Sequence, residues 1–227
     1  SQNGHTAHFW LISYQVSHVI TPPASGAVVS CQATIRSGVD YEEGSVIDEQ
    51  TDEHSAVAWW HAFHNRAVAA DGDHLEAHHP WCLGCGADNP HGHRLRARRR
   101  GDGVVARHVF DSRHRGAPGI AHGGAVVTVL DDMVGMLLYV VGDMAVTRKL
   151  DTEFFAPVLL GAPYEVSADL VSRIGRKLEV RTELREEATG QLVASADGLF
   201  VVVTLEHFTS SLRNGSALRD HPTTDSA

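Results

Sequence analysis

The chain has little cysteine. Its 227 residues include three cysteines, Cys31, Cys82 and Cys85. Three are too few for a disulfide framework, and an odd number leaves one unpaired, which excludes the class of small domains stapled by disulfides. A chain of this length can bury a sizeable core without disulfide bonds. We therefore expect a reducing environment and a cytoplasmic protein.

The chain also lacks an excess of positive charge. It has 19 Lys and Arg against 28 Asp and Glu, for a formal net charge of −9 at pH 7. General nucleic-acid binding depends on neutralising phosphates with a basic surface, so we expect no nucleic-acid partner. Small-molecule chemistry becomes the leading class of function.

No long apolar run is free of charge. The longest, from Gly123 to Val141, carries Asp131 and Asp132 near its middle, where a bilayer would penalise each charged side chain. The first thirty residues lack a basic start followed by a clean apolar segment and a small-residue cleavage site. We expect no membrane partner and no secretory signal.

The same apolar run is the most informative stretch that is present. Ala, Val, Leu and Met occupy every side of a 3.6-residue period, so a helix here has no polar face and must be wrapped by the rest of the domain. An ionised carboxylate in such surroundings is costly unless it is paired, hydrated or used. Asp131 and Asp132 are therefore candidate functional residues.

The segments on either side of this helix predict strands. Two precede it, at 95–100 and 104–110, separated by the hairpin signal Gly101, Asp102 and Gly103. Four follow it and are expected to form a meander, at 145–155, 164–171, 177–186 and 192–205. The arginines at 94, 96, 98, 99 and 100 are expected on a solvated strand face. This order predicts an α+β domain, a curved antiparallel sheet wrapped around one long central helix.

Three further regions flank the predicted domain, which we place at 79–208. Residues 1–45 show no sustained period and are expected to form a loosely ordered leader. Residues 46–78 are expected to contain a short helix outside the core, with Thr51 as a possible N-cap. Residues 209–227 are polar and are expected to form a flexible tail.

One segment before the strands is dense in residues that bind metals. Cys82 and Cys85 are separated by two residues, and four histidines lie nearby, His78, His79, His91 and His93. A structural zinc site needs four well-placed ligands, and one cysteine pair with scattered histidines is a weak signal. We therefore favour a turn-rich loop in which both cysteines act as small buried apolar residues, with zinc as the alternative.

Several motifs together resemble a known family. They are HGG at 122–124, Asp131 nine residues after His122, Thr147 with Pro157 ten residues later, and the lead-in CxGCGxxNPxG. These residues closely resemble the hotdog-fold acyl-CoA thioesterases of the PaaI type, including their vertebrate Akt-interacting relatives. The resemblance covers about residues 80 to 205. The chain departs from the family at Asp151 and Glu153, where close relatives often have Asn.

The resemblance implies a hotdog fold and an active site where two protomers meet, in a homodimer or a dimer of dimers. It implies that Asp131 is the catalytic carboxylate, that Gly123 and Gly124 open the helix, and that Thr147 helps to hold the attacking water. The substrate implied is an acyl-CoA. No cofactor and no metal are expected.

A thioester needs help at its carbonyl oxygen and help in bringing in water. The backbone N–H groups of Gly123 and Gly124, at the positive end of a helix, would form an oxyanion hole, and Asp131 would act as general base or nucleophile. Asp131 lies about 12 Å further along the helix axis, too far for one helix to supply both groups. We therefore expect the two groups to come from different protomers.

Each of these residues also has a purely structural interpretation. Asp131 could be a buried carboxylate that accepts hydrogen bonds from neighbouring backbone, and Asp132 could be solvent-facing or at an interface. His122 could bond the thioester oxygen or only cap the helix, and the sequence leaves both open.

Five basic residues stand at strand starts or turns where they could meet the phosphates of coenzyme A: Arg148, Lys149, Arg173, Arg176 and Lys177. Exposed basic side chains are more often only solvated. Two other functions stay open at this point. One is a non-catalytic acyl-CoA-binding or regulatory hotdog module, and the other is a hotdog enoyl-CoA hydratase or dehydratase.

Overall fold

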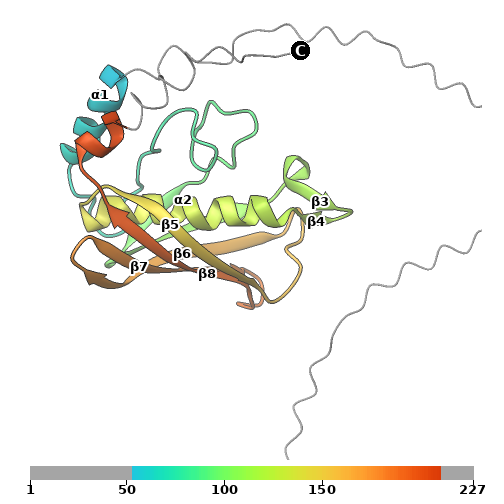
Figure 1. The fold of residues 1–227 in the computed structure, drawn as a ribbon. Helices are drawn as coiled ribbons and strands as arrows, with labels where there is room; N and C mark the ends of the chain where they lie inside the picture. Colours follow the sequence, from blue (N-terminus) through green and yellow to red (C-terminus); the bar gives the residue numbers. More distant parts are fainter. Residues whose placement is uncertain (1–52, 211–227) are drawn as a thin grey trace, which may run out of the picture. The chain divides into compact units, whose positions relative to one another are not determined.

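The computed structural model describes residues 53–210 (Figure 1). The leader predicted over 1–45, Thr51, Cys31 and the tail beyond residue 210 lie outside the described residues. The domain boundaries predicted from the sequence therefore stay predictions.

The centre of the domain is the helix α2, Gly123–Val141. Eight of its residues are buried, among them Met133 and Leu137 at 0% exposure. It ends at Gly142, whose positive φ of 82° suits glycine and whose N–H donates to the carbonyl of Leu138 at 2.8 Å. The length and apolar composition of α2 would also suit a membrane span, but the core helix of a folded domain has the same properties. Here the strands of the sheet pack against it.

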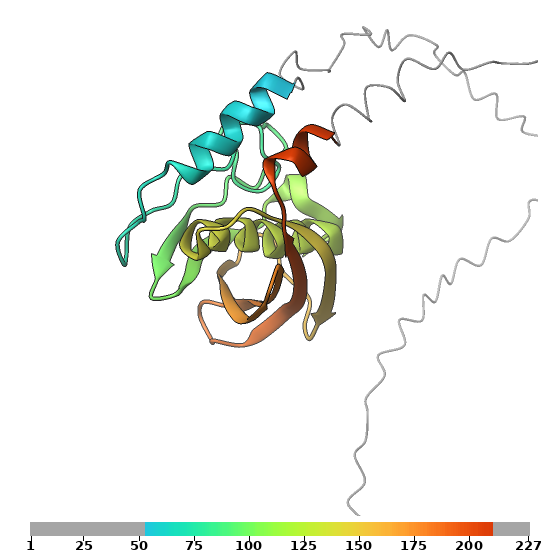
Figure 2. The same ribbon diagram turned by 60° about the vertical axis from the view of Figure 1, so that its left-hand side comes forward.

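A six-stranded antiparallel sheet curves around α2, as Figure 2 shows from its edge. In spatial order its strands are β1 Ala97–Arg100, β2 Gly103–Val109, β6 Pro163–Ile174, β7 Lys177–Glu186, β8 Leu192–Val202 and β5 Ala145–Phe154. On β7, Leu178 and Val180 face the core while Glu179 and Arg181 face solvent, because successive side chains of a strand alternate. The predicted hotdog fold is confirmed.

The order of the last four strands differs from the predicted meander. β6, β7 and β8 do follow one another, but β5 lies at the far edge of the sheet, paired with β8 from Ala145 opposite Val202 to Phe154 opposite Ala194. The prediction was wrong because alternation reports which face of a strand is buried and says nothing about its neighbour. The short elements between β2 and α2 were also missed: a 3-10 turn at Ser112–His114, β3 at Arg115–Ala117 and β4 at Ile120–Ala121.

The predicted N-terminal helix is present as α1, Glu53–His64. It lies outside the sheet, but Phe63 reaches the core, with its ring centroid 4.9 Å from that of Tyr139 on α2. Residues 205–210 form a second short helical segment, so the strand predicted to reach Leu205 ends earlier. Its Phe208 meets Trp59 and Trp60 of α1 edge-on, at 5.6 and 5.7 Å.

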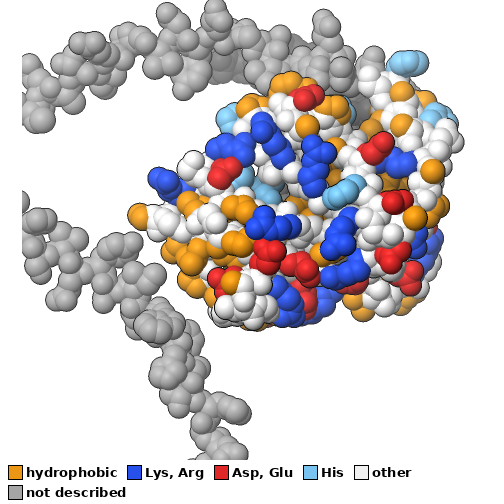
Figure 3. All heavy atoms as spheres, turned by 180° about the vertical axis from the view of Figure 1, so that it is seen from behind, with side chains coloured by type: hydrophobic (Ala, Val, Ile, Leu, Met, Phe, Trp, Pro, Cys, Tyr) orange, Lys and Arg blue, Asp and Glu red, His pale blue; other side chains and the backbone are white. Residues whose placement is uncertain are grey.

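The surface is charged in both signs. Figure 3 shows a face on which Lys and Arg side chains gather with Asp and Glu between them. On β1, Arg98 and Arg100 are exposed while Ala97 is fully buried, as predicted for a solvated strand face. Arg100 pairs with Glu165 on β6 at 3.1 Å, so acidic neighbours interrupt the basic stretch.

Candidate active site

The N-terminus of α2 is capped by His122. Its ring atom Nδ1 accepts a hydrogen bond from the backbone N–H of Gly124 at 2.9 Å. A Cβ on residue 124 would lie only 3.0 Å from that nitrogen, so glycine there makes room for the cap. Of the two roles left open for His122, the structure shows the cap. A neutral imidazole that accepts at Nδ1 carries its proton on Nε2, so the exposed edge of the ring is a donor.

The cap reduces the number of free amides at this helix end. The N–H of Gly124 is used by His122, and those of Ala125 and Val126 donate to the carbonyl of His122. Among the described residues, nothing accepts from the N–H of Gly123. Gly123 lines a pocket of about 460 Å³ with Val126 and with half-exposed aromatic side chains, Phe154 and Phe155. One backbone donor, not two, is therefore available to a ligand.

Asp131 lies two turns further along α2, where Thr147 of β5 donates a hydrogen bond from Oγ1 to Oδ1 at 2.9 Å. Burial raises the pKa of Asp131, and the bond from Thr147 opposes that rise. The structural interpretation in which neighbouring backbone satisfies Asp131 does not hold among the described residues, because its hydrogen bond comes from the side chain of Thr147. The sequence-predicted pair Asp131 and Thr147 is thus in direct contact.

Asp131 lines a pocket of about 380 Å³. Its other walls are mostly apolar and include Trp59 and Phe63 of α1, with Thr147 and Phe200 from the sheet. Gly123 lines a different pocket, so one protomer does not bring the helix N-terminus and Asp131 together. This agrees with the separation of about 12 Å between Gly123 and Asp131 that is expected from the rise of an α-helix.

Asp132 is not solvent-facing, contrary to one structural interpretation of the sequence. Its side chain is 9% exposed and faces the loop that precedes β1, with Oδ1 3.2 Å from Sγ of Cys82 and 3.3 Å from Nδ1 of His78. The same His78 nitrogen lies 3.1 Å from Sγ of Cys85. Of the histidines near the cysteine pair, only His78 joins it, and Cys82 and Cys85 are polar partners rather than simple apolar residues.

These contacts perturb every group in the cluster. Burial alone would lower the pKa of His78, but Asp132 and Cys82 outweigh it and raise that pKa to about 10. The contact with Cys85 lowers the pKa of Cys82 to about 3, and the same contact raises the pKa of Cys85. Burial raises the pKa of Asp132. The cluster therefore contains more buried acidic groups than its one imidazole can neutralise.

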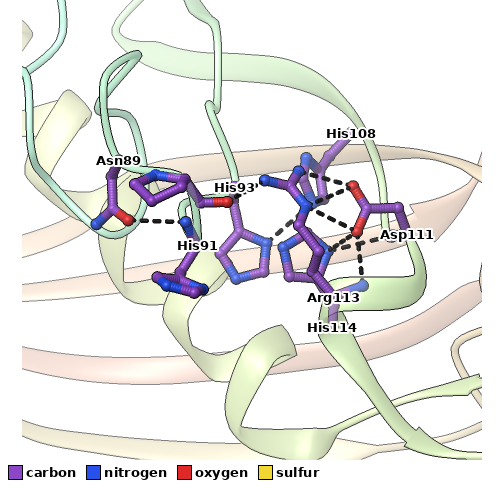
Figure 4. Close-up of polar contacts among 8 residues, drawn as sticks. Asn89, His91, His93, His108, Asp111, Arg113 and His114 are labelled. Atoms are coloured by element: carbon purple, nitrogen blue, oxygen red, sulfur yellow. Dashed lines mark hydrogen bonds and ion pairs between the residues drawn. The ribbon is translucent and has the colours of Figure 1, made fainter. Parts of the chain in front are cut away.

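A second group of imidazoles supports the N-terminus of α2 (Figure 4). His93, His108 and His114 are buried, with Nδ1 of His93 3.2 Å from Nε2 of His108 and the rings of His93 and His114 stacked at 3.9 Å. The carbonyl of His114 accepts from the N–H of His122 at 2.7 Å. His93 was grouped with the cysteines in the sequence, and the structure places it here instead.

Two of the five predicted phosphate-binding residues are engaged in ion pairs. Lys149 pairs with Asp151, and Arg173 pairs with Asp143, both at 2.5 Å. Arg176 lies in the turn between β6 and β7, Lys177 begins β7, and Arg148 is exposed on the edge strand β5. Among the described residues these last three have no ion-pair partner within 4 Å.

Comparison with known proteins identifies the family of one region of the chain. The sequence profile of the thioesterase superfamily matches residues 118–193, which include α2, β5, β6 and β7. This part of the chain belongs to the thioesterase superfamily. The predicted family is confirmed, and the thioesterase-superfamily region contains every residue of the predicted site.

The relatives of this thioesterase-superfamily region are similar over part of their length. An acyl-coenzyme A thioesterase THEM4 of Bos taurus is 32% identical over 87 residues, which is 38% of this chain and 35% of the relative. The chain thus matches about a third of that protein. A crystal structure of a thioesterase superfamily protein is 28% identical with a TM-score of 0.45, covering 47% of this chain and 53% of the other. A mutant phenylacetic acid degradation protein PaaI from Thermus thermophilus is 26% identical with a TM-score of 0.42, covering 45% and 86%.

Proposed function

We propose that this protein hydrolyses acyl-CoA thioesters to a free acid and coenzyme A. The observation that carries the proposal is Asp131, a half-buried carboxylate oriented by Thr147 at the wall of a largely apolar pocket, in a chain of the thioesterase superfamily. The apolar walls suit an acyl chain. The relative from Bos taurus is named an acyl-coenzyme A thioesterase, which supports this substrate class.

In the proposed reaction, Asp131 either removes a proton from the attacking water or attacks the thioester carbon itself. The developing oxyanion accepts from the free N–H of Gly123, and the outward Nε2–H of His122 is a second donor within the same helix end. Gly124 serves the cap and contributes no free donor. The thiolate of coenzyme A leaves, and no cofactor is needed.

We propose that a second copy of the chain completes the site. Thr147 lies beside Asp131 at one end of β5, and Phe154 lies against Gly123 at the other end. β5 is an edge strand with free backbone groups. A two-fold axis near Leu150 and Asp151 would pair two β5 strands antiparallel, with residue 147 opposite residue 154. Asp131 of each protomer then approaches Gly123 of the other.

Arg176 and Lys177, which have no ion pair among the described residues, are the better candidates for the phosphates of coenzyme A. Arg176 and Lys177 adjoin β8, whose partner strand β5 carries Thr147. Lys149 and Arg173 would first have to leave Asp151 and Asp143, which makes them weaker candidates than the sequence suggested.

The proposal is tested by measuring release of free thiol from a panel of acyl-CoA substrates. Asp131→Asn keeps the shape of the side chain but removes the base, so turnover should fall about 10²- to 10⁴-fold. Asp102→Asn, at a fully exposed turn position, is the matched control and should keep full activity. Hydrolysis by Asp131→Asn at the rate of the parent would contradict the assignment.

The same panel separates the other functions. A parent protein that binds acyl-CoA and releases no thiol is a binding module, and one that hydrates enoyl-CoA is a hydratase. A single turnover in H₂¹⁸O then separates the two roles of Asp131. A general base puts ¹⁸O into the first product. A nucleophile forms a mixed anhydride with the acyl group, and attack of water on its Asp131 carbonyl carbon leaves ¹⁶O of the enzyme in the product and ¹⁸O in Asp131.

A further inference from the structure

We propose that His78, Cys82, Cys85 and Asp132 bind one Zn²⁺ ion that fastens the loop at 78–86 to α2. The four donor atoms, one from each residue, all lie within 4.8 Å of one another. They come from a loop and from a helix position 50 residues beyond Cys82, so only the folded chain brings them together. The proposal does not depend on the thioesterase activity.

The spacing of the donors fits a tetrahedral ion. Ligands bound at about 2.0 to 2.3 Å from a tetrahedral zinc lie roughly 3.3 to 3.8 Å from each other. The observed separations are 3.1 Å between Cys85 Sγ and His78 Nδ1, 3.2 Å between Cys82 Sγ and Asp132 Oδ1, and 3.3 Å between His78 Nδ1 and Asp132 Oδ1. Small outward shifts would admit the ion.

The cluster is poorly satisfied by protein groups alone. Both cysteines are free thiols, and Oδ2 of Asp132 is buried without a hydrogen-bond partner. A buried carboxylate with an unsatisfied oxygen is costly, and such groups call for an explanation such as an ion. A divalent cation neutralises two thiolates and a carboxylate down to a net charge of −1 with a neutral imidazole.

The backbone around the cluster is shaped for close approach. A Cβ on Gly84 would lie 2.1 Å from Cγ of Asp132, and a Cβ on Gly135 would lie 2.5 Å from Cε1 of His78. Glycine at these two positions lets the loop and α2 come into contact. The turn is closed by the N–H of Gly86 donating to the carbonyl of Cys82, and the N–H of His78 donates to Sγ of Cys85. Such N–H···S bonds favour a thiolate.

The donor set selects the metal and its role. Two thiolates exclude Mg²⁺ and Ca²⁺, which prefer oxygen, and the two-residue gap between the cysteines is typical of zinc sites. Four protein ligands leave no open position for water, so the ion is structural rather than catalytic. Asp132 and His78 line the same pocket as Asp131, and the ion would give the two adjacent carboxylates different tasks: Asp132 holds the metal, and Asp131 stays free of it.

The test is metal analysis of the full chain, purified without a histidine tag and in a Cys31→Ser background that removes the remaining thiol. We expect one Zn²⁺ per chain, and Co²⁺ added to the metal-free protein should give thiolate charge-transfer bands with the intense visible bands of tetrahedral coordination. Cys82→Ser and Cys85→Ser should each lose the metal and these bands. His91→Gln, an exposed histidine in the same segment, should keep them.

Variants that fail to fold would not obscure the result, because the metal-free parent reports on the same site. Its circular dichroism checks the fold, and its titration with Zn²⁺ should show one tight equivalent and a higher melting temperature. A parent that binds no Zn²⁺ or Co²⁺, gives an octahedral Co²⁺ spectrum, or keeps the metal in the Cys82→Ser/Cys85→Ser double variant overturns the proposal.

Discussion

Thr147 is the residue whose contact most directly orients the proposed catalytic group. Its hydroxyl is one of a few polar groups in a mostly apolar pocket wall, and it donates to Asp131. Because Thr147 is exposed to the pocket and β-branched, valine can replace it on the strand without disturbing the packing.

Thr147→Val should therefore lower kcat and leave the fold intact. A hydrogen bond to a charged group contributes about 1.5 to 3 kcal/mol, which corresponds to roughly a 10- to 100-fold loss. KM should change little, since the bond orients Asp131 and does not bind the acyl chain. Steady-state kinetics measure both constants, and Thr147→Ser, which keeps the hydroxyl, should recover most of the rate. Equal activity of the valine and serine variants would show that the hydroxyl has no role.

The residue-level prediction placed Asp131 and Thr147 in one site because a motif fixed both positions. The structure shows that their side chains are in contact, and their catalytic roles stay predictions. The surroundings of Asp132 could not be predicted, because its partners lie in a loop some 50 residues earlier and no local pattern reports such a contact. The cysteine pair is the one local feature that points to a metal site here. The sequence does not show which residues would supply the third and fourth ligands.

At the scale of elements, the edge strand β5 decides how two chains could meet. The proposed two-fold axis places Arg148 of one protomer opposite Glu153 of a partner subunit, twice per dimer. Both side chains are exposed, and neither has an ion-pair partner among the described residues. Opposite charges across an antiparallel pair stabilise it, and like charges weaken it. In the proposed dimer, the departure from the family at Glu153 supplies the acidic partner of Arg148.

Arg148→Glu and Glu153→Arg should each shift the chain from dimer to monomer, because each variant sets like charges opposite one another. The double variant Arg148→Glu/Glu153→Arg restores opposite charges and should restore the dimer. Sedimentation velocity at low ionic strength measures the shift, and added salt should reduce the difference between variants. Singles that stay dimeric, or a double variant that does not recover, would place the axis elsewhere.

Most elements of the fold could be predicted because their signals are local. The apolar period of α2, the alternation of β7 and the glycine turns lie within short windows of sequence. The position of β5 beside β8 could not be predicted in this way, since it depends on how the chain returns across the sheet. β3 and β4 are too short for any period to show.

For the whole molecule, the buried histidines predict sensitivity to acid. Burial first, and then the neighbouring imidazoles and Arg113, lower the pKa of His93 to about 3; burial and His114 lower that of His108 to about 4. The pKa of His114 is lowered too, and Asp111 opposes all three shifts. The unfolded chain binds these protons near pH 6.5, and the folded chain does not.

These histidines should therefore make their full contribution to the free energy of unfolding above about pH 6.5. That contribution should fall as the pH drops toward 4. Urea midpoints measured between pH 7 and 4.5, with a chelator present so that metal release plays no part, should decrease steadily. Arg113 lowers the pKa of Asp111 to about 2, and the contribution of that carboxylate is lost only below its unfolded value of about 3.9, outside this window. A midpoint that stays constant over this range would show that the imidazoles are protonated without cost in the folded protein.

The contact of α1 with the pocket has a consequence for how this protein could change over evolutionary time. Trp59 and Phe63 line the pocket of Asp131, and the indole of Trp59 donates to the carbonyl of His78 at 2.9 Å. The depth of this pocket is thus set partly by a helix that lies outside the sheet. On the proposed function, selection could lengthen or shorten the preferred acyl chain by altering that one helix, while Asp131 and the core that supports it stay unchanged.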